Sequence, residues 1–153
     1  VVNDKEEFFA DAVILATGHS ARDIFYLLHK KGVTIEAKPF ALGVRIEHPQ
    51  ELIDEIQYSQ RKREENLPAA SYALVAQAGG RGVFSFCMCP GGIVAPCATA
   101  PGEIVTNGWS PSKRNNPYAN SGIVVAIDAK DWKNYQKHRK VELVLQKLYK
   151  IQC

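Results

Sequence analysis

A short, unbroken apolar segment near the start of the chain constrains the fold more than any other feature. It reads Ala12-Val13-Ile14-Leu15-Ala16 and lies between the polar Asp11 and the turn residue Gly18. A run of this length without polar alternation is typical of a strand that is buried on both faces, as in the centre of a parallel sheet. We therefore predict a central parallel strand over residues 12–16.

A helix is predicted directly after this strand. Residues 24–28 carry an apolar stripe at helical spacing, Ser20 is suited to the N-cap, and Gly32 is suited to the position just past the last turn. A strand, a tight turn of small residues and a helix together form a β-α unit of an α/β sheet.

The middle of the chain predicts mostly strands. Apolar residues alternate with smaller or polar ones over residues 40–47, and Pro49 is suited to open a short helix. Further strands are expected over residues 72–78, 83–89, 93–97, 104–106 and 122–127, with turns at 79–82 and 90–92, polar loops at 60–66 and 109–121, and a final helix over 141–151. The predicted fold class is therefore α/β in the mixed α+β sense.

The composition is that of a folded globular segment. Hydrophobic residues make up 46% of the 153 residues and charged residues 23%, which excludes the disordered, collagen-like and coiled-coil classes. No apolar run approaches the roughly 18 residues of a membrane-spanning helix. The chain begins at Val1 with neither an initiator methionine nor a signal peptide, and we expect it to be a segment of a longer protein.

The net charge of +3 is unevenly distributed along the chain. Residues 130–153 hold seven basic and two acidic residues, whereas the rest of the chain is slightly acidic. A nucleic-acid-binding body is therefore not expected, because such a body carries its basic patch on the folded core.

The four cysteines do not indicate a disulfide scaffold, which is typical of short and cysteine-dense chains. Cys87 and Cys89 are two residues apart, near the limit for bridging within one strand. We expect free thiols in a reducing compartment, and hence a cytoplasmic protein. A metal site is not expected, because no histidine lies close to Cys89 in the sequence.

Four blocks of the sequence resemble a bacterial family of FAD-dependent dehydrogenases. The blocks are AVILATGHSARD at 12–23, KPFALGVRIEHPQ at 38–50, FSFCMCPGG at 84–92 and VTNG at 105–108. The first block contains an Ala-Thr-Gly strand end that is similar to the second motif of flavoproteins with two dinucleotide-binding domains. Four blocks in the same order are far more specific than one glycine motif.

The resemblance implies a division of the chain into three parts. Residues 1–38 would be the remnant of a Rossmann-like FAD-binding α/β domain, residues 39–127 a strand-rich, largely antiparallel substrate-type domain inserted into it, and residues 128–153 a C-terminal helical segment. The family's Gly-x-Gly-x-x-Gly fingerprint for the FAD pyrophosphate is absent from the sequence. We therefore expect FAD to bind the complete protein and not this segment.

The resemblance also implies the activity of an FAD-dependent oxidoreductase, a dehydrogenase that transfers electrons or a hydride at the flavin. Its substrate would be an unidentified small molecule and its partner the rest of the longer protein, with no membrane and no nucleic acid. The segment alone is expected to be inactive. The alternative is a non-catalytic module that binds anions or nucleic acid through a basic C-terminal helix with Lys137, Arg139 and Lys140.

Two sets of candidate site residues follow, and no catalytic residue is assigned. The cofactor-binding set is the predicted strand end and its turn, because ligands of α/β sheets bind beyond the carboxyl ends of strands; an ordinary β-α turn is the alternative. This set is Ala16, Thr17, Gly18, His19 and Ser20. The substrate- or flavin-facing set is Arg45, Cys87, Cys89, Pro90, Gly91, Gly92, Asn107 and Asn120.

The second set has alternatives as well. Arg45 and Glu47 share one strand face and would form an exposed ion pair. The two cysteines would be small buried side chains instead of a redox dithiol, and asparagines are common in loops as turn residues.

Overall fold

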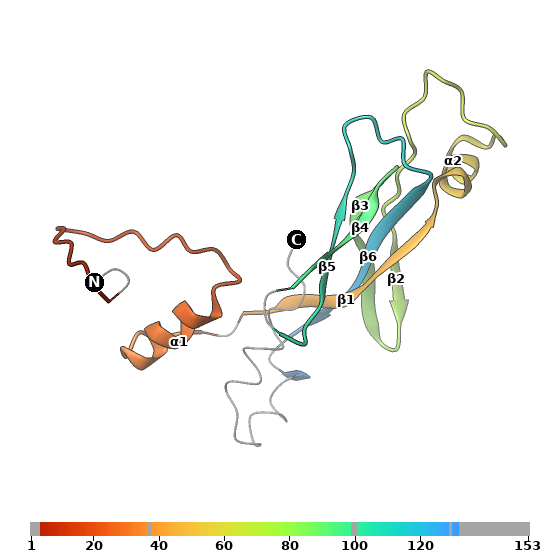
Figure 1. The fold of residues 1–153 in the computed structure, drawn as a ribbon. Coiled ribbons are helices and arrows are strands. Elements are labelled where there is room, and N and C mark those ends of the chain that lie inside the picture. Colours follow the sequence, from red (N-terminus) through yellow and green to blue (C-terminus); the bar gives the residue numbers. More distant parts are fainter. Residues whose placement is uncertain (1–3, 37, 99–100, 129, 132–153) are drawn as a thin grey trace. The chain divides into compact units, whose positions relative to one another are not determined.

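A computed structural model describes residues 4–36, 38–98, 101–128 and 130–131 (Figure 1). The chain forms two compact units, Val1–Ile35 and Glu36–Cys153. Helix α1 (Arg22–Lys30) lies in the first unit, and all the other helices and strands of the described residues lie in the second. No helix in the described part of the chain is long and apolar enough to cross a membrane.

Helix α1 ends as predicted but begins one residue later than expected. Gly32 has a φ of +79°, and its N–H donates to the His29 carbonyl while the Val33 N–H donates to the Leu28 carbonyl, both at 3.0 Å. These two bonds form a Schellman motif, in which glycine accepts the left-handed conformation without strain. The prediction of Ser20 as N-cap is wrong, because Ala21 takes that position and no side chain caps the helix.

The prediction of a strand over residues 12–16 is also wrong for this structure. The segment forms no strand, and Val13, Ile14 and Leu15 are 85%, 91% and 52% exposed. A central parallel strand needs hydrogen-bonding neighbours on both sides. The described residues of the first unit contain no other strand to serve as such a neighbour, and none of the residues of α1 is buried.

The second unit is built on a four-stranded antiparallel sheet in the order β1-β6-β3-β2. Its strands are β1 (Phe40–Pro49), β2 (Val75–Ala78), β3 (Arg81–Cys89) and β6 (Tyr118–Ile127). The longest pairing joins β1 and β6 over ten residues, from Phe40 opposite Ile127 to Pro49 opposite Tyr118. Helix α2 (Gln50–Tyr58) follows β1 directly (Figure 1).

A second, two-stranded antiparallel sheet lies against the first. It consists of β4 (Ile93–Cys97) and β5 (Val105–Trp109), and it contacts β1, β3 and β6. The strand-rich, antiparallel character predicted for the middle of the chain is therefore confirmed. The predicted Rossmann-like sheet is not formed by the described residues.

Most elements of the second unit agree with their predictions, and the differences are at the ends. Strand β2 begins at Val75 instead of residue 72, and β5 extends to Trp109. Strand β6 begins at Tyr118, so Asn120 and Ser121 are strand residues and not loop residues. The predicted final helix over 141–151 and the basic residues Lys137, Arg139 and Lys140 lie outside the described residues.

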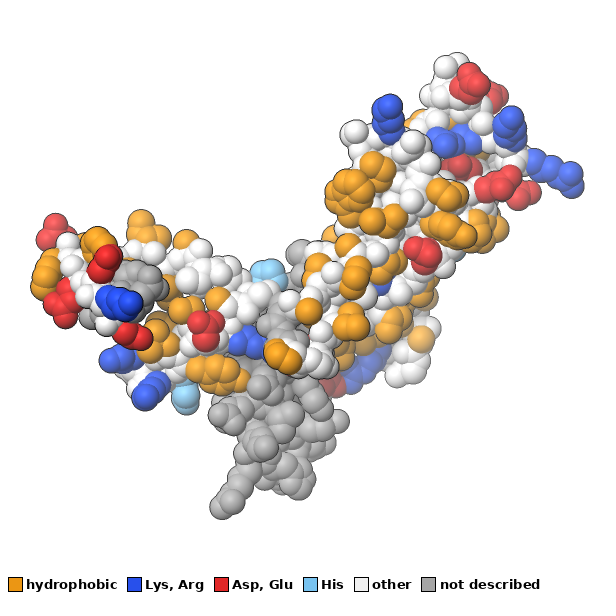
Figure 2. All heavy atoms as spheres, in the orientation of Figure 1, with side chains coloured by type: hydrophobic (Ala, Val, Ile, Leu, Met, Phe, Trp, Pro, Cys, Tyr) orange, Lys and Arg blue, Asp and Glu red, His pale blue; other side chains and the backbone are white. Residues whose placement is uncertain are grey.

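The buried core lies where β6 meets its neighbours and α2. Its apolar members are Ile53, Ala69, Ala70, Ala119 and Val124. Many other apolar side chains remain at the surface, among them Leu42, Val44 and Ile46 of β1, and Figure 2 shows apolar side chains exposed over both units. The core of the described residues is therefore small for the length of the chain.

The close pairing of β1 with β6 requires glycine at position 43. A Cβ built on Gly43 would collide with the backbone of Ile123 and Val124 in β6. We predict that Gly43→Ala lowers the free energy of unfolding by at least about 3 kcal/mol, because the backbone of a paired strand cannot move aside cheaply. Urea denaturation followed by circular dichroism measures this loss.

Gly82→Ala is the matched control in the same sheet. A Cβ at Gly82 would meet nothing nearer than 3.8 Å, the Gln77 side-chain nitrogen. Its effect is expected within about 0.5 kcal/mol, the range of ordinary surface substitutions. Equal effects of the two alanines would contradict the close approach of β1 and β6.

Candidate functional site

A polar cluster joins strands β1, β3 and β6 beneath strand β5. From β1, the Arg45 Nη1 donates to Asn120 Oδ1 in β6 at 2.8 Å and to the Cys87 carbonyl in β3 at 3.0 Å. We call Arg45, Cys87, Cys89, Gly108 and Asn120 the Arg45 cluster. A charged donor makes both bonds stronger than neutral ones, so Arg45 ties three strands together at one point.

A β-bulge in β3 supplies the two cysteines of the Arg45 cluster. The register between β3 and β6 shifts between Phe86 and Cys89, and Cys87 within the bulge has a φ of +48°. Such a φ is costly for a residue other than glycine. The Cys87 carbonyl accepts from Arg45 and, at 3.4 Å, from the Cys89 Sγ. The bulge thus leaves Cys87 exposed and turns Cys89 toward β5.

Gly108 of β5 completes the Arg45 cluster. A Cβ on this glycine would collide with the Arg45 Nη1 and would lie 2.5 Å from Asn120 Oδ1 and 2.7 Å from Cys89 Sγ. Only glycine lets β5 pack over these side chains. The candidate residue beside it, Asn107, is exposed.

Asn120 is the most deeply buried member of the cluster. Its side chain is fully buried, and its Nδ2 has no hydrogen-bond partner among the described residues. A buried amide donor without a partner costs free energy. The burial of Asn120 follows from its place in β6, whereas the sequence predicted a polar loop over residues 109–121.

The Pro90-Gly91-Gly92 turn is buried and fixed by its neighbours. The Gly91 N–H donates to Gln50 Oε1 at 2.7 Å, the Gly92 N–H to the Tyr118 carbonyl at 2.8 Å, and the Ser110 hydroxyl to the Pro90 carbonyl at 2.8 Å. Added Cβ atoms at the two glycines would collide with the backbone of Arg114 and Trp109. The chain itself therefore covers the backbone of this turn.

The predicted site residues did not include Gln50, whose side chain holds this turn, nor Asp54 and Arg63, which hold Gln50 in place. Gln50 and Asp54 of α2 are buried, and Arg63 pairs through its Nε with Asp54 Oδ2 at 2.9 Å. Arg63 lies in the predicted polar loop 60–66 and is half-buried through this ion pair. The sequence offers one signal for the Asp54–Arg63 ion pair, since Asp54 directly follows the apolar Ile53 in the helix. This signal is weak because a run of charged residues such as 60–66 is usually solvated.

The five candidate residues Ala16 to Ser20 belong to the first unit and are all exposed. Gly18 has a φ of +77°, a conformation that glycine adopts without strain in the tight turn before α1. The second candidate set lies entirely in the second unit, where Arg45, Cys87, Cys89 and Asn120 come together.

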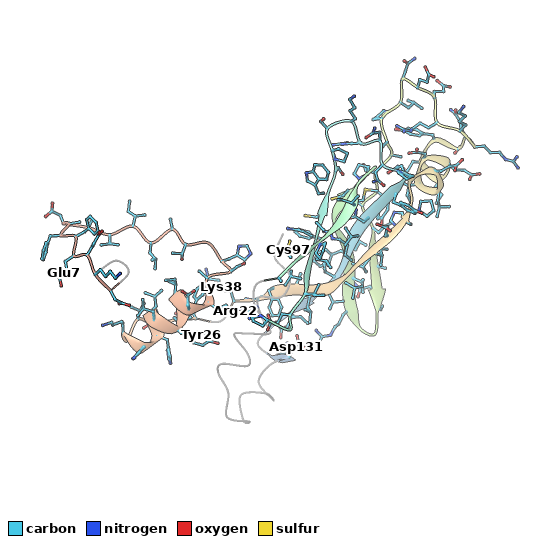
Figure 3. All side chains as sticks on the ribbon, in the orientation of Figure 1. Glu7, Arg22, Tyr26, Lys38, Cys97 and Asp131 are labelled. Atoms are coloured by element: carbon cyan, nitrogen blue, oxygen red, sulfur yellow. The ribbon has the colours of Figure 1, made fainter. Side chains whose placement is uncertain are left out.

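A cavity of about 380 Å³ lies at the other end of the sheet, and none of the candidate residues lines it. Its lining residues are Gly79, Gly80, Arg81, Gly82, Ala126, Asp128, Lys130 and Asp131. Arg81 forms an ion pair with Asp131 (labelled in Figure 3), and this contact lowers the pKa of the Asp131 carboxyl to about 2. Arg81 and Lys130 balance the charges of Asp128 and Asp131 around this cavity. The described residues contain no group of side chains suited to a metal ion.

His48 and Tyr72 pack against each other beside Ser121 on β6. Their ring centroids are 5.5 Å apart, and the His48 Nε2 is buried without a partner in the described structure. Burial lowers the pKa of His48, opposed by the nearby Glu47 charge. Burial raises the pKa of Tyr72, opposed by its hydrogen bond with Ser121. Burial therefore disfavours the charged form of the His48 imidazole.

This arrangement predicts a pH dependence of stability. A histidine whose folded pKa lies below its unfolded value of about 6.5 binds protons preferentially in the unfolded state. Stability is therefore expected to fall as the pH drops from about 7 through 6.5, and this fall should be shallower in His48→Gln. Urea denaturation at several pH values measures both slopes. An unchanged slope, or the same change in the exposed control His29→Gln, would contradict the lowered pKa of His48.

Comparison with known proteins places this architecture in a family. Residues 39–150 match the model of the family described as "FAD-dependent protein, C-terminal domain-like". A Clostridium beijerinckii protein named "Uncharacterized protein" is 45% identical over 144 residues, which are 93% of this chain and 27% of that relative. The chain thus spans about a quarter of the length of this curated relative. It belongs to the FAD-dependent protein family, of which it carries the C-terminal-like domain.

Proposed function

We propose that the longer protein to which this chain belongs is an FAD-dependent oxidoreductase, a dehydrogenase that transfers electrons or a hydride at its flavin. The family match over residues 39–150 is the observation that carries this proposal. The substrate in this proposal is a small molecule, and the main partner of the segment is the rest of the protein.

The residues of the second unit do not fit FAD by themselves. A flavin that lies against a glycine backbone needs open space at the Cβ position, but at Gly91, Gly92 and Gly108 that position is filled by the chain's own atoms. The Pro90-Gly91-Gly92 turn is buried for the same reason. We therefore assign the anchoring of FAD to the longer protein outside the Glu36–Asp131 part of the chain.

The second unit then acts as a substrate-side domain that presents the exposed edge of the Arg45 cluster. Cys87 and Asn107 are the exposed candidates at or beside the cluster, whereas Asn120 and the Pro90-Gly91-Gly92 turn lie behind them. This arrangement supports a domain with a rigid interior and an accessible rim, as expected for a surface that meets a ligand or another domain.

The exposed apolar residues of the first unit support the same proposal. Val13 and Ile14 are almost fully exposed although they are strongly apolar, and Gly18 already has the backbone conformation of a tight turn before α1. Exposed apolar residues in an extended segment are those of a strand without its sheet. We propose that residues 12–16 join a parallel sheet of the FAD-binding domain in the longer protein.

Flavin binding tests the proposal. We predict that the longer protein is purified with bound FAD, seen by its visible absorbance, and that the present chain shows no saturable binding in a fluorescence titration with FAD. The physical reason is that this chain lacks a pyrophosphate fingerprint and that its glycine positions are filled. Gly18→Val in the longer protein should reduce the bound flavin severalfold, because valine strongly disfavours a φ of +77°.

Gly82→Ala in the longer protein is the control, since this glycine has no positive φ and lies in a surface hairpin. A folded longer protein that neither contains nor binds FAD would contradict the proposed function. Saturable FAD binding by the present chain would instead contradict the assignment of the anchor to the rest of the protein.

A further inference from the structure

We propose that Gln50 is a positioning residue that clamps the Pro90-Gly91-Gly92 turn and thereby sets the geometry of the Arg45 cluster. The link to a reaction rests on the proposed function, but the clamp itself is a property of this chain. Gln50 is the first residue of α2 and is only 4% exposed. A carboxamide so deeply buried must place both its donors and its acceptor on partners.

The carboxamide oxygen of Gln50 holds the turn. Its Oε1 accepts the Gly91 N–H at 2.7 Å, and Gly91 has a φ of +50°. Gly91 lies between β3 and β4, so its N–H does not take part in a strand ladder, while its carbonyl accepts the Asn116 N–H at 3.3 Å. The side chain of Gln50 therefore takes the part of a neighbouring strand for this turn.

The nitrogen of the same carboxamide holds Gln50 in place. Its Nε2 donates to Asp54 Oδ1 at 2.8 Å and to the Ala70 carbonyl at 3.0 Å. Asp54 Oδ1 also accepts the Ala70 N–H at 2.8 Å, and the Arg63 Nε pairs with its other oxygen at 2.9 Å. Both nitrogen bonds require an amide donor, so the orientation of the carboxamide is fixed and its oxygen faces Gly91.

The turn passes this constraint on to the Arg45 cluster through two routes. Cys89 directly precedes the turn, and its Sγ lies against Gly108. The Gly92 N–H donates to the Tyr118 carbonyl at 2.8 Å, two residues before Asn120. Because close-packed interiors transmit displacements, a shift of the turn moves Cys89 and β6 and changes the bulge that exposes Cys87.

The test uses this chain and three variants. Gln50→Leu removes the acceptor and both donors, while Gln50→Glu keeps an acceptor for Gly91 but places a carboxylate beside Asp54. Gln57→Leu is the matched control, because Gln57 is an exposed glutamine in the same helix. Hydrogen exchange of the Gly91 amide reports the clamp, and the alkylation rate of Cys87 by iodoacetamide, relative to that of the exposed Cys97, reports the cluster.

We expect Gln50→Leu to speed exchange at Gly91 by about tenfold, the effect of losing one hydrogen bond to a buried amide. The alkylation ratio of Cys87 to Cys97 should change severalfold, and Gln57→Leu should change neither quantity. Gln50→Glu should give smaller changes in the same direction while the β1–β6 amides stay protected, and it decides the test if Gln50→Leu does not fold.

Unchanged Gly91 exchange and an unchanged alkylation ratio in the folded Gln50 variants would overturn the proposal. An equal loss of protection at every amide would overturn it as well, since that result describes general instability and not positioning. Failure of the longer protein to bind FAD would remove the proposed reaction but leave these outcomes intact, so the two failures are distinguishable.

Discussion

The bond between Arg45 and Asn120 is the interaction on which the second unit depends. Asn120 is fully buried, and its Oδ1 receives a charged donor from the adjacent strand while the same nitrogen holds the Cys87 carbonyl of the bulge. Without Arg45, a buried oxygen and a strained segment of β3 would both lose a partner. At this end of the sheet, one guanidinium group thus links β1, β3 and β6.

The glycines around this bond act in packing. Gly43 lets β1 pair closely with β6, Gly108 lets β5 cover the Arg45 cluster, and Gly91 and Gly92 leave room for the backbone of Arg114 and Trp109. In many cofactor domains the same residue type leaves room for a ligand. Here the Cβ positions of Gly43, Gly91, Gly92 and Gly108 are filled by the chain's own atoms.

Much of the second unit could be predicted because its signals are local. Alternation in β1, the proline before α2 and the glycine turn between β2 and β3 each define a short segment without reference to the rest of the chain. Arg45, Cys87, Cys89 and Asn120 were singled out as candidates, although their meeting point depends on strand order and on a bulge that no local pattern shows.

The parts that could not be predicted depend on distant partners. The apolar segment 12–16 has the composition of a buried strand, but pairing needs neighbouring strands that the described residues of the first unit do not contain. Asn120 and Ser121 resemble loop residues, yet burial in the sheet extends β6 through them. The buried pair of Gln50 and Asp54 resembles a solvated helix face until Gly91 and Ala70 are placed against it.

A double-mutant cycle between Arg45 and Asn120 tests the central claim most directly. The free energy of unfolding is measured by urea denaturation for the unmodified chain, Arg45→Met, Asn120→Ala and the double variant. The account predicts a coupling energy of at least about 1.5 kcal/mol, as for groups in one buried network. The same cycle between Arg45→Met and Tyr58→Phe should give a coupling near zero, since the Tyr58 hydroxyl donates to the Pro68 carbonyl at 2.9 Å and Tyr58 is not part of the Arg45 cluster. Additive effects of Arg45 and Asn120 would contradict the account.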